Sequence, residues 1–313
     1  MAGSVVRSVL LGASRSDRLR GAVERVPLTR NLVARFVAGT DEADAVRVTR
    51  ELEADGLTVT IDFLGEDTLD PAQAAAVADA YVSLLGTLAD EGLAGGAEVS
   101  VKLSAVGQAL PDDGAKLALD HARRIAEAAT SAGTTLTLDM EDHTTTDSTL
   151  GVLRELRTDF PDTGAVLQAY LRRTEADCRD LAYAGSRVRL CKGAYDEPAA
   201  VAFKDDREVD RSYVRCMKVL LGGDGYPMLA THDPRLVEIA GSLAARYRRE
   251  QGSYEYQMLY GVRPDEQRRL VQAGERVRVY VPYGEEWYGY LVRRLAERPA
   301  NVGFFLRQVA SKK

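Results

Sequence analysis

The sequence predicts an α/β fold, a (β/α)8 barrel of the TIM type with helices ahead of it and a final helix over its C-terminal face. From Leu57 onward, short β-rich runs alternate with helical segments in eight successive units. Strict alternation of strand and helix requires parallel strands, and eight units within about 250 residues close such a barrel. No internal repeat or low-complexity linker divides these units into two domains.

Residues 1–50 form a helical, amphipathic segment ahead of the barrel. Val33, Phe36 and Val37 are spaced so that they share one face of a helix. The sequence Gly-Thr-Asp-Glu at residues 39–42 then ends one helix and caps the next. We therefore predict an N-terminal helical segment, residues 1–50, followed by a barrel domain, residues 51–313.

The eight strands are expected where apolar and polar residues alternate, because side chains of an extended chain point to opposite faces in turn. Their predicted ranges are 58–64, 98–103, 135–141, 165–170, 187–191, 228–231, 254–259 and 276–281. Helical patterns lie between them, such as residues 71–90 and 115–129.

One parity of each strand is apolar and faces the helices, and the other carries charge into the barrel interior. The interior cations and anions balance, and they are Lys102, Arg187, Arg189, Arg278, Asp62, Asp139, Glu141 and Glu255. Arg187 and Arg278 begin their strands, which predicts structural ion pairs at the bottom of the barrel. Lys102, Asp139 and Arg189 lie near strand ends, where barrels place their chemistry, and are the first site candidates.

The composition excludes several classes of function. A net charge of −6, without a lysine-rich run, argues against nucleic acid as a partner. The three cysteines and three histidines form no CxxC, HExxH or other metal-ligand spacing, so we expect no metal. We see no signal peptide and no apolar run of about 18 residues. Widely spaced cysteines fit a reducing compartment, and we predict a cytoplasmic protein with at most peripheral contact at the inner face of the membrane.

The last helical segment carries a second charged group of residues. Tyr290, Arg293, Arg294 and Glu297 are spaced at i, i+3, i+4 and i+7 and share one helical face. A solvated charged face is the usual meaning of such a pattern. Arginine ahead of glutamate is, however, the weaker order for helix stability, so support of the isolated helix explains the pattern poorly.

Together these motifs resemble one family, proline dehydrogenase, the flavin-dependent enzymes of proline catabolism. The likeness runs from about residue 58 to the C-terminus, and its motifs in order are LGED, SVKLSA, TLDMED, LQAYLR, RLCKGAYDE, ATHDP, YEYQMLYGV, VYVPYGEEW and YLVRRLAERPANVGF. The resemblance implies a monofunctional bacterial flavoprotein whose (β/α)8 barrel binds the nucleotide FAD at the strand C-termini. No GxGxxG follows a strand here, so a Rossmann-type site is absent.

On the cofactor side, the resemblance places Arg189 near the flavin N5. The residues that it implies in FAD binding are Asp139, Met140, Gln168, Arg189, Cys191, Lys192, Gly193, Ala194, Thr231, His232, Arg294 and Glu297. Cys191 stands where the family pattern has an aliphatic residue, a difference that leaves a backbone contact intact.

On the substrate side, the resemblance implies that Lys102, Arg293 and Arg294 clamp the carboxylate of L-proline. The proline-binding residues it implies are Lys102, Ala194, Tyr195, Leu259, Tyr280, Arg293 and Arg294, and the catalytic set, Lys102, Tyr280, Arg293 and Arg294, also includes Asp139 and Arg189. Glu66 falls where a carboxylate pairs with the first arginine and gates the site.

The reaction implied by the resemblance is oxidation of L-proline to 1-pyrroline-5-carboxylate. Hydride would pass from proline C5 to flavin N5, and the electrons would continue to a membrane quinone. A separate 1-pyrroline-5-carboxylate dehydrogenase would then act on the product.

The residues alone leave two other functions open. Lys102 and Lys192 both follow strands, as the Schiff-base lysines of barrel aldolases do, and a barrel can also bind a ligand without catalysis. Of the histidines, we expect His143 on the surface and His121 solvated within a helix. His232 directly follows a strand and is expected to make a structural hydrogen bond or a ligand contact.

Overall fold

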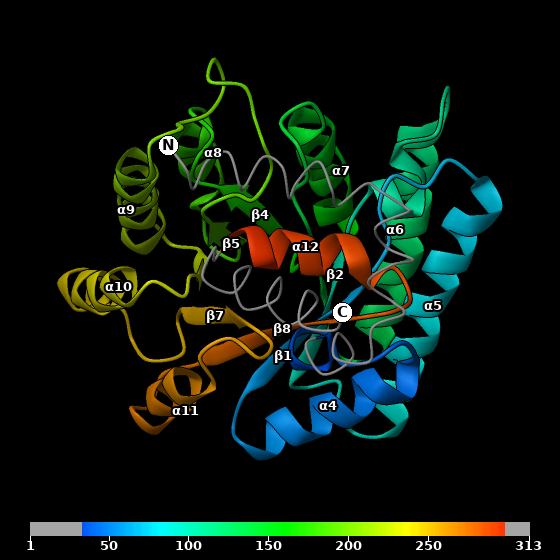
Figure 1. Ribbon diagram of the computed structural model, residues 1–313, viewed down its shortest axis with the longest axis horizontal. Helices are drawn as coiled ribbons and strands as arrows, with labels where there is room; N and C mark the ends of the chain where they lie inside the picture. Colours follow the sequence, from blue (N-terminus) through cyan, green and yellow to red (C-terminus); the bar gives the residue numbers. More distant parts are fainter. Residues whose placement is uncertain (1–32, 298–313) are drawn as a thin grey trace, which may run out of the picture.

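The structure is a computed structural model that describes residues 33–297, without the side chains of residues 295–297. Eight parallel strands form a closed barrel in sequence order, and β1 pairs with β8 to complete it. In Figure 1 the helices surround the strands, and α12 crosses the end of the barrel that faces the viewer. The predicted fold class is confirmed. The predicted domain boundary between residues 50 and 51 stays a prediction.

All eight predicted strands are present, with small differences at their ends. They are β1 (Thr58–Phe63), β2 (Ala97–Val101), β3 (Leu136–Leu138), β4 (Gly164–Gln168), β5 (Arg187–Cys191), β6 (Tyr226–Ala230), β7 (Glu255–Leu259) and β8 (Val277–Tyr283). The largest difference is in β3, which ends at Leu138, three residues before the predicted end. The Asp139 amide still donates to Val101 O at 2.9 Å, and beyond it the chain leaves the sheet.

The helices between and around the strands begin at sequence signals. They are α4 (Glu42–Ala54), α5 (Pro71–Asp90), α6 (Gly114–Ser131), α7 (Thr146–Asp159), α8 (Thr174–Leu181), α9 (Asp206–Gly222), α10 (Pro234–Arg246), α11 (Pro264–Gln272) and α12 (Trp287–Glu297), with a short π-helical turn, η1 (Ser104–Gln108), after β2. The side chains of Asp70, Asp205 and Asp233 accept hydrogen bonds from the first turns of α5, α9 and α10. Such caps satisfy backbone N–H groups that have no partner within the helix.

The bottom of the barrel is closed by ion pairs, as predicted. Arg187 Nη2 lies 2.5 Å from Glu98 Oε2, and Arg278 Nε lies 2.8 Å from Glu255 Oε1. Burial acts to raise the pKa of Glu98, but Arg187, Arg278 and Arg189 outweigh it and lower this pKa well below its usual range. The carboxylate therefore stays charged and joins three strands from inside the barrel.

The described part of the N-terminal segment packs against the final helix. Residues 33–36 are helical, and Val33, Phe36 and Val37 share a cluster with Tyr290 and Leu291 of α12. The predicted apolar face is therefore confirmed, and Asp41 caps α4 as expected. Residues 1–32 lie outside the described part of the chain.

Helix α5 corrects the expectation that the chain has no apolar run of about 18 residues. Its 20 residues have a mean hydropathy of 1.2 over the most apolar window, enough to cross a membrane by length and composition. Tyr81, Leu84, Leu85 and Leu88 are nevertheless fully buried. The Tyr81 hydroxyl also donates to Ser100 O of β2 at 2.6 Å. These contacts are those of a helix that packs on the barrel.

Candidate active site

Arg189 and Asp139 meet at the C-terminal end of the barrel. Arg189 Nη1 lies 2.8 Å from Asp139 Oδ1 and donates to Ser100 Oγ at 3.0 Å. The Tyr280 hydroxyl donates to Asp139 Oδ2 at 2.6 Å, and the guanidinium carbon of Arg189 lies 5.2 Å from the centre of the Tyr280 ring. The chain just after β3 and strands β5 and β8 thus bring together three residues that the sequence analysis assigned to the site.

Lys102, the residue after β2, is held by Asp62 of β1. Its Nζ lies 2.7 Å from both carboxylate oxygens, and both side chains are buried. Burial acts to lower the pKa of Lys102, but Asp62, Asp139 and Glu66 raise it above its usual value. Burial raises the pKa of Asp62 to about 6, although Lys102 opposes this shift. Lys102 is therefore a fixed cation at neutral pH.

Arg293 of α12 pairs with Glu66, which lies in the loop after β1. Nη1 lies 2.9 Å from Oε2 and Nη2 lies 2.5 Å from Oε1, with 15% of the arginine side chain and 25% of the glutamate side chain exposed. A two-pronged geometry of this kind uses the planar shape of the guanidinium. Glu66 meets the first arginine as predicted, and the pair fastens the final helix to the barrel.

The charges of these three groups act on one another, so they form one cluster. Glu66 acts on Lys102, and Asp62 acts on Arg293. Burial raises the pKa of the Tyr195 hydroxyl well above its usual value, and Glu66 adds to that shift. The sequence analysis expected Lys102, Arg189 and Arg293 to share one region. The effects of their carboxylate partners on one another's groups agree with this expectation.

The segment after β5 runs along this cluster. Burial raises the pKa of the Cys191 thiol to about 12, with Asp139 adding to the shift and Arg189 and Arg294 opposing it. Burial therefore favours the neutral form of this thiol, whose Sγ lies 3.6 Å from Leu167 O. Gly193 has φ +105°, and a Cβ built on it would lie 2.3 Å from the Tyr170 ring. Only glycine allows this close approach of backbone to ring.

Most of the remaining predicted residues lie at the ends of four neighbouring strands, β3 to β6. Gln168 Nε2 donates to Glu141 O at 2.6 Å. Met140, the residue before Glu141, is buried. Thr231 Oγ1 accepts from the Asp233 amide at 3.1 Å, and His232 Nε2 accepts from the Leu259 amide at 2.8 Å. Lys192 Nζ pairs with Asp210 at 2.5 Å and Asp233 at 3.4 Å, and Ala194 is partly buried. The side chain of Glu297 lies outside the described residues.

Several residues of the cluster were not recognised from the sequence. Asp62 and Glu141 were identified only as interior charges, and Ser100 and Glu197 were not singled out. The expectation that His143 is a surface residue is wrong in part, because its ring bonds the buried carboxylate of Glu197. His121 is also partly buried, and its Nδ1 lies 2.9 Å from Val106 O. The parity of Asp62 was the one sequence signal that could have paired it with Lys102.

Burial also raises the pKa of the Glu141 carboxyl, to about 7, while hydrogen bonds from Ser104 oppose the shift. Its oxygens accept from Ser104 Oγ at 2.5 Å and Ser104 N at 3.1 Å.

Within residues 33–294 no group of three or more His, Cys, Asp and Glu side chains could hold a metal ion.

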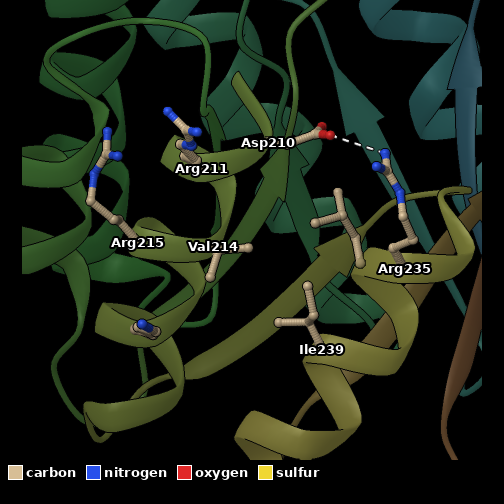
Figure 2. Close-up of a pocket in the computed structure, with 8 residues that line it drawn as sticks. Asp210, Arg211, Val214, Arg215, Arg235 and Ile239 are labelled. Carbon is tan, nitrogen blue, oxygen red and sulfur yellow. Dashed lines mark hydrogen bonds and ion pairs between the residues drawn. The ribbon is translucent and has the colours of Figure 1, made fainter. Parts of the chain in front are cut away.

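A surface groove of about 460 Å³ lies elsewhere, between α9 and α10. Figure 2 shows Val214 and Ile239 projecting into it, and Asp210 paired with Arg235 at its upper end. None of its eight lining residues was predicted as a site residue. One of its lining residues, Asp210, pairs with Lys192, which follows β5.

Comparison with known proteins gives consistent matches. The family profile described as proline dehydrogenase matches residues 45–307. Proline dehydrogenase 1 of Bacillus subtilis (strain 168) is 39% identical over 284 residues, 91% of this chain and 92% of that protein. Proline dehydrogenase of Deinococcus radiodurans is 40% identical over 279 residues, 88% of this chain and 89% of that protein. The crystal structure of proline utilization A (PutA) from Bdellovibrio bacteriovorus, inactivated by N-propargylglycine, matches with a TM-score of 0.79 and 28% identity, over 90% of this chain and 34% of that one.

Proposed function

The chain belongs to the proline dehydrogenase family, and from that premise we propose that it oxidises L-proline to 1-pyrroline-5-carboxylate with FAD as its cofactor. One observation carries the proposal. Three cations, Lys102, Arg189 and Arg293, gather at the C-terminal end of one barrel, and each lies against a carboxylate. Such a cluster suits a small zwitterion beside a redox-active ring, because charged groups can bind the substrate and stabilise the reduced cofactor.

The residues present fit a flavin. Arg189 is buried, and its Nε and Nη2 atoms make no hydrogen bond, although Nη2 lies 3.5 Å from Glu98 Oε1. Buried N–H groups of this kind are costly unless a ligand accepts from them. We propose that Asp139, Gln168, Arg189 and the backbone of residues 191–194 hold the isoalloxazine, and that Met140, Lys192, Thr231, His232, Arg294 and Glu297 complete the cofactor site. Bound FAD would supply the two-electron oxidation of L-proline.

We propose that Lys102, Arg293 and Arg294 bind the proline carboxylate. Glu66 accepts from Nη1 and Nη2 of Arg293, and a substrate carboxylate that took its place would receive the same two charge-assisted bonds. Glu66 therefore acts as the gate in this proposal. The guanidinium would have two carboxylate acceptors both before and after the exchange.

The other side chains of the cluster orient the substrate and the charge. We propose that the pyrrolidine ring packs against Tyr280, Leu259, Tyr195 and Ala194. The Tyr280 hydroxyl is fixed by Asp139. Arg189, pointed by Asp139 and Ser100, would stabilise negative charge that develops on the reduced ring. Fixing both partners in advance is how an enzyme reduces the entropy cost of reaction.

The aldolase alternative is not favoured. A Schiff-base lysine must lose its proton to attack a carbonyl group. Asp62 raises the pKa of Lys102 against the effect of burial, which keeps it protonated. Lys192 is held between two aspartates, Asp210 and Asp233.

The electron acceptor and the next enzyme are also part of the proposal. We propose a membrane quinone as acceptor, reached by peripheral contact at the inner face of the membrane, and a separate dehydrogenase for 1-pyrroline-5-carboxylate. Cys178, Cys191 and Cys216 are free thiols, which is compatible with the cytoplasm.

The proposed function can be tested with a substrate analogue. The related PutA from Bdellovibrio bacteriovorus is inactivated by N-propargylglycine. We expect this compound to inactivate the present enzyme in a time-dependent manner that L-proline slows. Purified protein that carries FAD yet forms no pyrroline product from L-proline, with a soluble dye or quinone as acceptor, would overturn the proposal.

A further inference from the structure

Glu197 lies in the loop between β5 and α9, and its carboxylate is 3% exposed. It accepts hydrogen bonds from the backbone amide of His143 at 2.9 Å and from the Tyr170 hydroxyl at 3.2 Å. The Nδ1 atom of His143 donates to its other oxygen. His143 follows β3 and Tyr170 follows β4. One buried carboxylate therefore joins the segments that follow three consecutive strands.

Those three segments carry most of the residues proposed to hold the isoalloxazine. Asp139 precedes His143 by four residues, Gln168 precedes Tyr170 by two, and residues 191–194 lead into Glu197. The Tyr170 amide also donates to Lys192 O at 2.9 Å. A shift of Tyr170 would therefore move the backbone of residues 191–194, which we propose to hold the isoalloxazine.

Tyr170 transmits the position of Glu197 to the proposed cofactor cradle. The Tyr170 ring lies so close to Gly193 that a Cβ there would clash at 2.3 Å. The hydroxyl of that ring is fixed by Glu197. Without the carboxylate, the ring could turn, and the Gly193 backbone would lose the surface that supports it.

Resting on the proposed function, we propose that Glu197 is a positioning residue for the flavin: its carboxylate fixes the relative positions of the loops after β3, β4 and β5 without touching the cofactor. A structural role alone would need only that the buried charge be satisfied. Here the three donors come from two other loops and none from the loop of Glu197 itself, which is the arrangement of a tie between loops.

The test compares flavin affinity with thermal stability in four variants of the holoenzyme. Glu197→Ala removes all three acceptor contacts. Glu197→Gln keeps an oxygen for the His143 amide and the Tyr170 hydroxyl, and Tyr170→Phe removes one hydroxyl only. Glu266→Gln is the matched control, because Glu266 of α11 is also a mostly buried carboxylate, with 14% of its side chain exposed, and accepts two bonds from Arg269 at 2.9 and 2.7 Å, away from the three loops.

The FAD dissociation constant is measured from the rise in flavin fluorescence on dilution, and the visible circular dichroism of bound flavin reports its surroundings. We expect the dissociation constant to rise about tenfold or more in Glu197→Ala and about threefold in Tyr170→Phe, with Glu197→Gln between wild type and Glu197→Ala. The flavin dichroism should change in Glu197→Ala. Glu266→Gln should lower the melting temperature and leave both flavin readouts unchanged.

Two results would separate the possible failures. In the first, wild type binds FAD, and both Tyr170→Phe and Glu197→Gln bind it with unchanged affinity and dichroism while only their melting temperatures fall. Glu197 is then merely structural, and the inference is overturned. If folded wild type binds no FAD, the proposed function fails first. Tyr170→Phe decides the matter even if Glu197→Ala does not fold, because it deletes a single hydroxyl.

Discussion

Arg293 on the last described helix and Glu66 after the first strand are 227 residues apart in sequence, yet they form a two-pronged ion pair, with N–O distances of 2.9 and 2.5 Å. The pair closes the polar cluster at the C-terminal end of the barrel. It uses Nη1 and Nη2 of Arg293, two of the five N–H groups of the guanidinium. A substrate carboxylate that binds the same edge of Arg293 would therefore compete with Glu66.

Replacing Arg293 by alanine should raise the Michaelis constant for L-proline by at least about tenfold, because a hydrogen bond to a charged group is worth about 1.5–3 kcal/mol. Arg293→Lys keeps the charge but loses the planar two-donor geometry. Its Michaelis constant should therefore lie between those of the wild type and Arg293→Ala. Arg124→Ala, which removes an exposed arginine of α6 that pairs with Asp79, should leave the constant unchanged. Steady-state kinetics decide, and an unaltered constant in Arg293→Ala would remove this residue from the clamp.

The same pair should be measurable in stability. In a double-mutant cycle of Glu66→Ala and Arg293→Ala, we expect a coupling of about 1–2 kcal/mol in the free energy of unfolding, since both side chains are mostly buried. Urea denaturation of the four proteins gives the coupling. Simple additivity would mean that the two side chains do not pair in solution.

Arg189 should tune the flavin. Replacing it by methionine removes a cation that we place beside the ring, so the two-electron midpoint potential should become more negative by roughly 30 mV or more, which corresponds to about 1.4 kcal/mol. Arg189→Lys should recover part of the shift. Potentiometric titration of the bound flavin measures both, and a methionine variant with the wild-type potential would show that Arg189 lies away from the reactive ring.

Glu141 should make stability depend on pH. Its folded-state pKa of about 7 is above the value of about 4.3 expected for an unfolded chain, so the folded protein binds the proton more tightly. Its contribution is present below about pH 4 and is lost as the pH rises through 7, by at most about 4 kcal/mol. Glu141→Gln should flatten the fall in melting temperature between pH 5 and pH 8. The exposed control Asp79→Asn should keep the wild-type profile, and a Glu141→Gln profile equally steep would rule out this residue as the cause.

The sequence was sufficient to predict the fold and the charged residues around the barrel axis. Strand and helix alternate strictly, and strand parity separates the apolar residues, such as Ile61 and Val99, from the interior charges. The division of those charges between bottom and top followed from where each lies along its strand, and Arg187, Arg278 and Arg189 are placed accordingly.

The partners of those charges could not be predicted in the same way. Asp62 pairs with Lys102, and Ser100 accepts from Arg189, because neighbouring and opposite strands meet in a closed barrel whose register one sequence does not specify. Glu197 and His143 lie in loops without periodic patterns, and their contact depends on how two loops fold over the strand ends. Pairing across a barrel is set by tertiary packing and not by local sequence.

The central claim is that the cation cluster at the end of this barrel binds FAD beside L-proline. The most direct measurement is the visible absorption spectrum of the purified, FAD-loaded protein without oxygen, before and after L-proline is added. We predict an oxidised flavin spectrum that bleaches on addition of L-proline and does not change with glycine. A folded protein whose bound flavin keeps its full colour in excess L-proline, or one that refuses FAD altogether, would contradict the account.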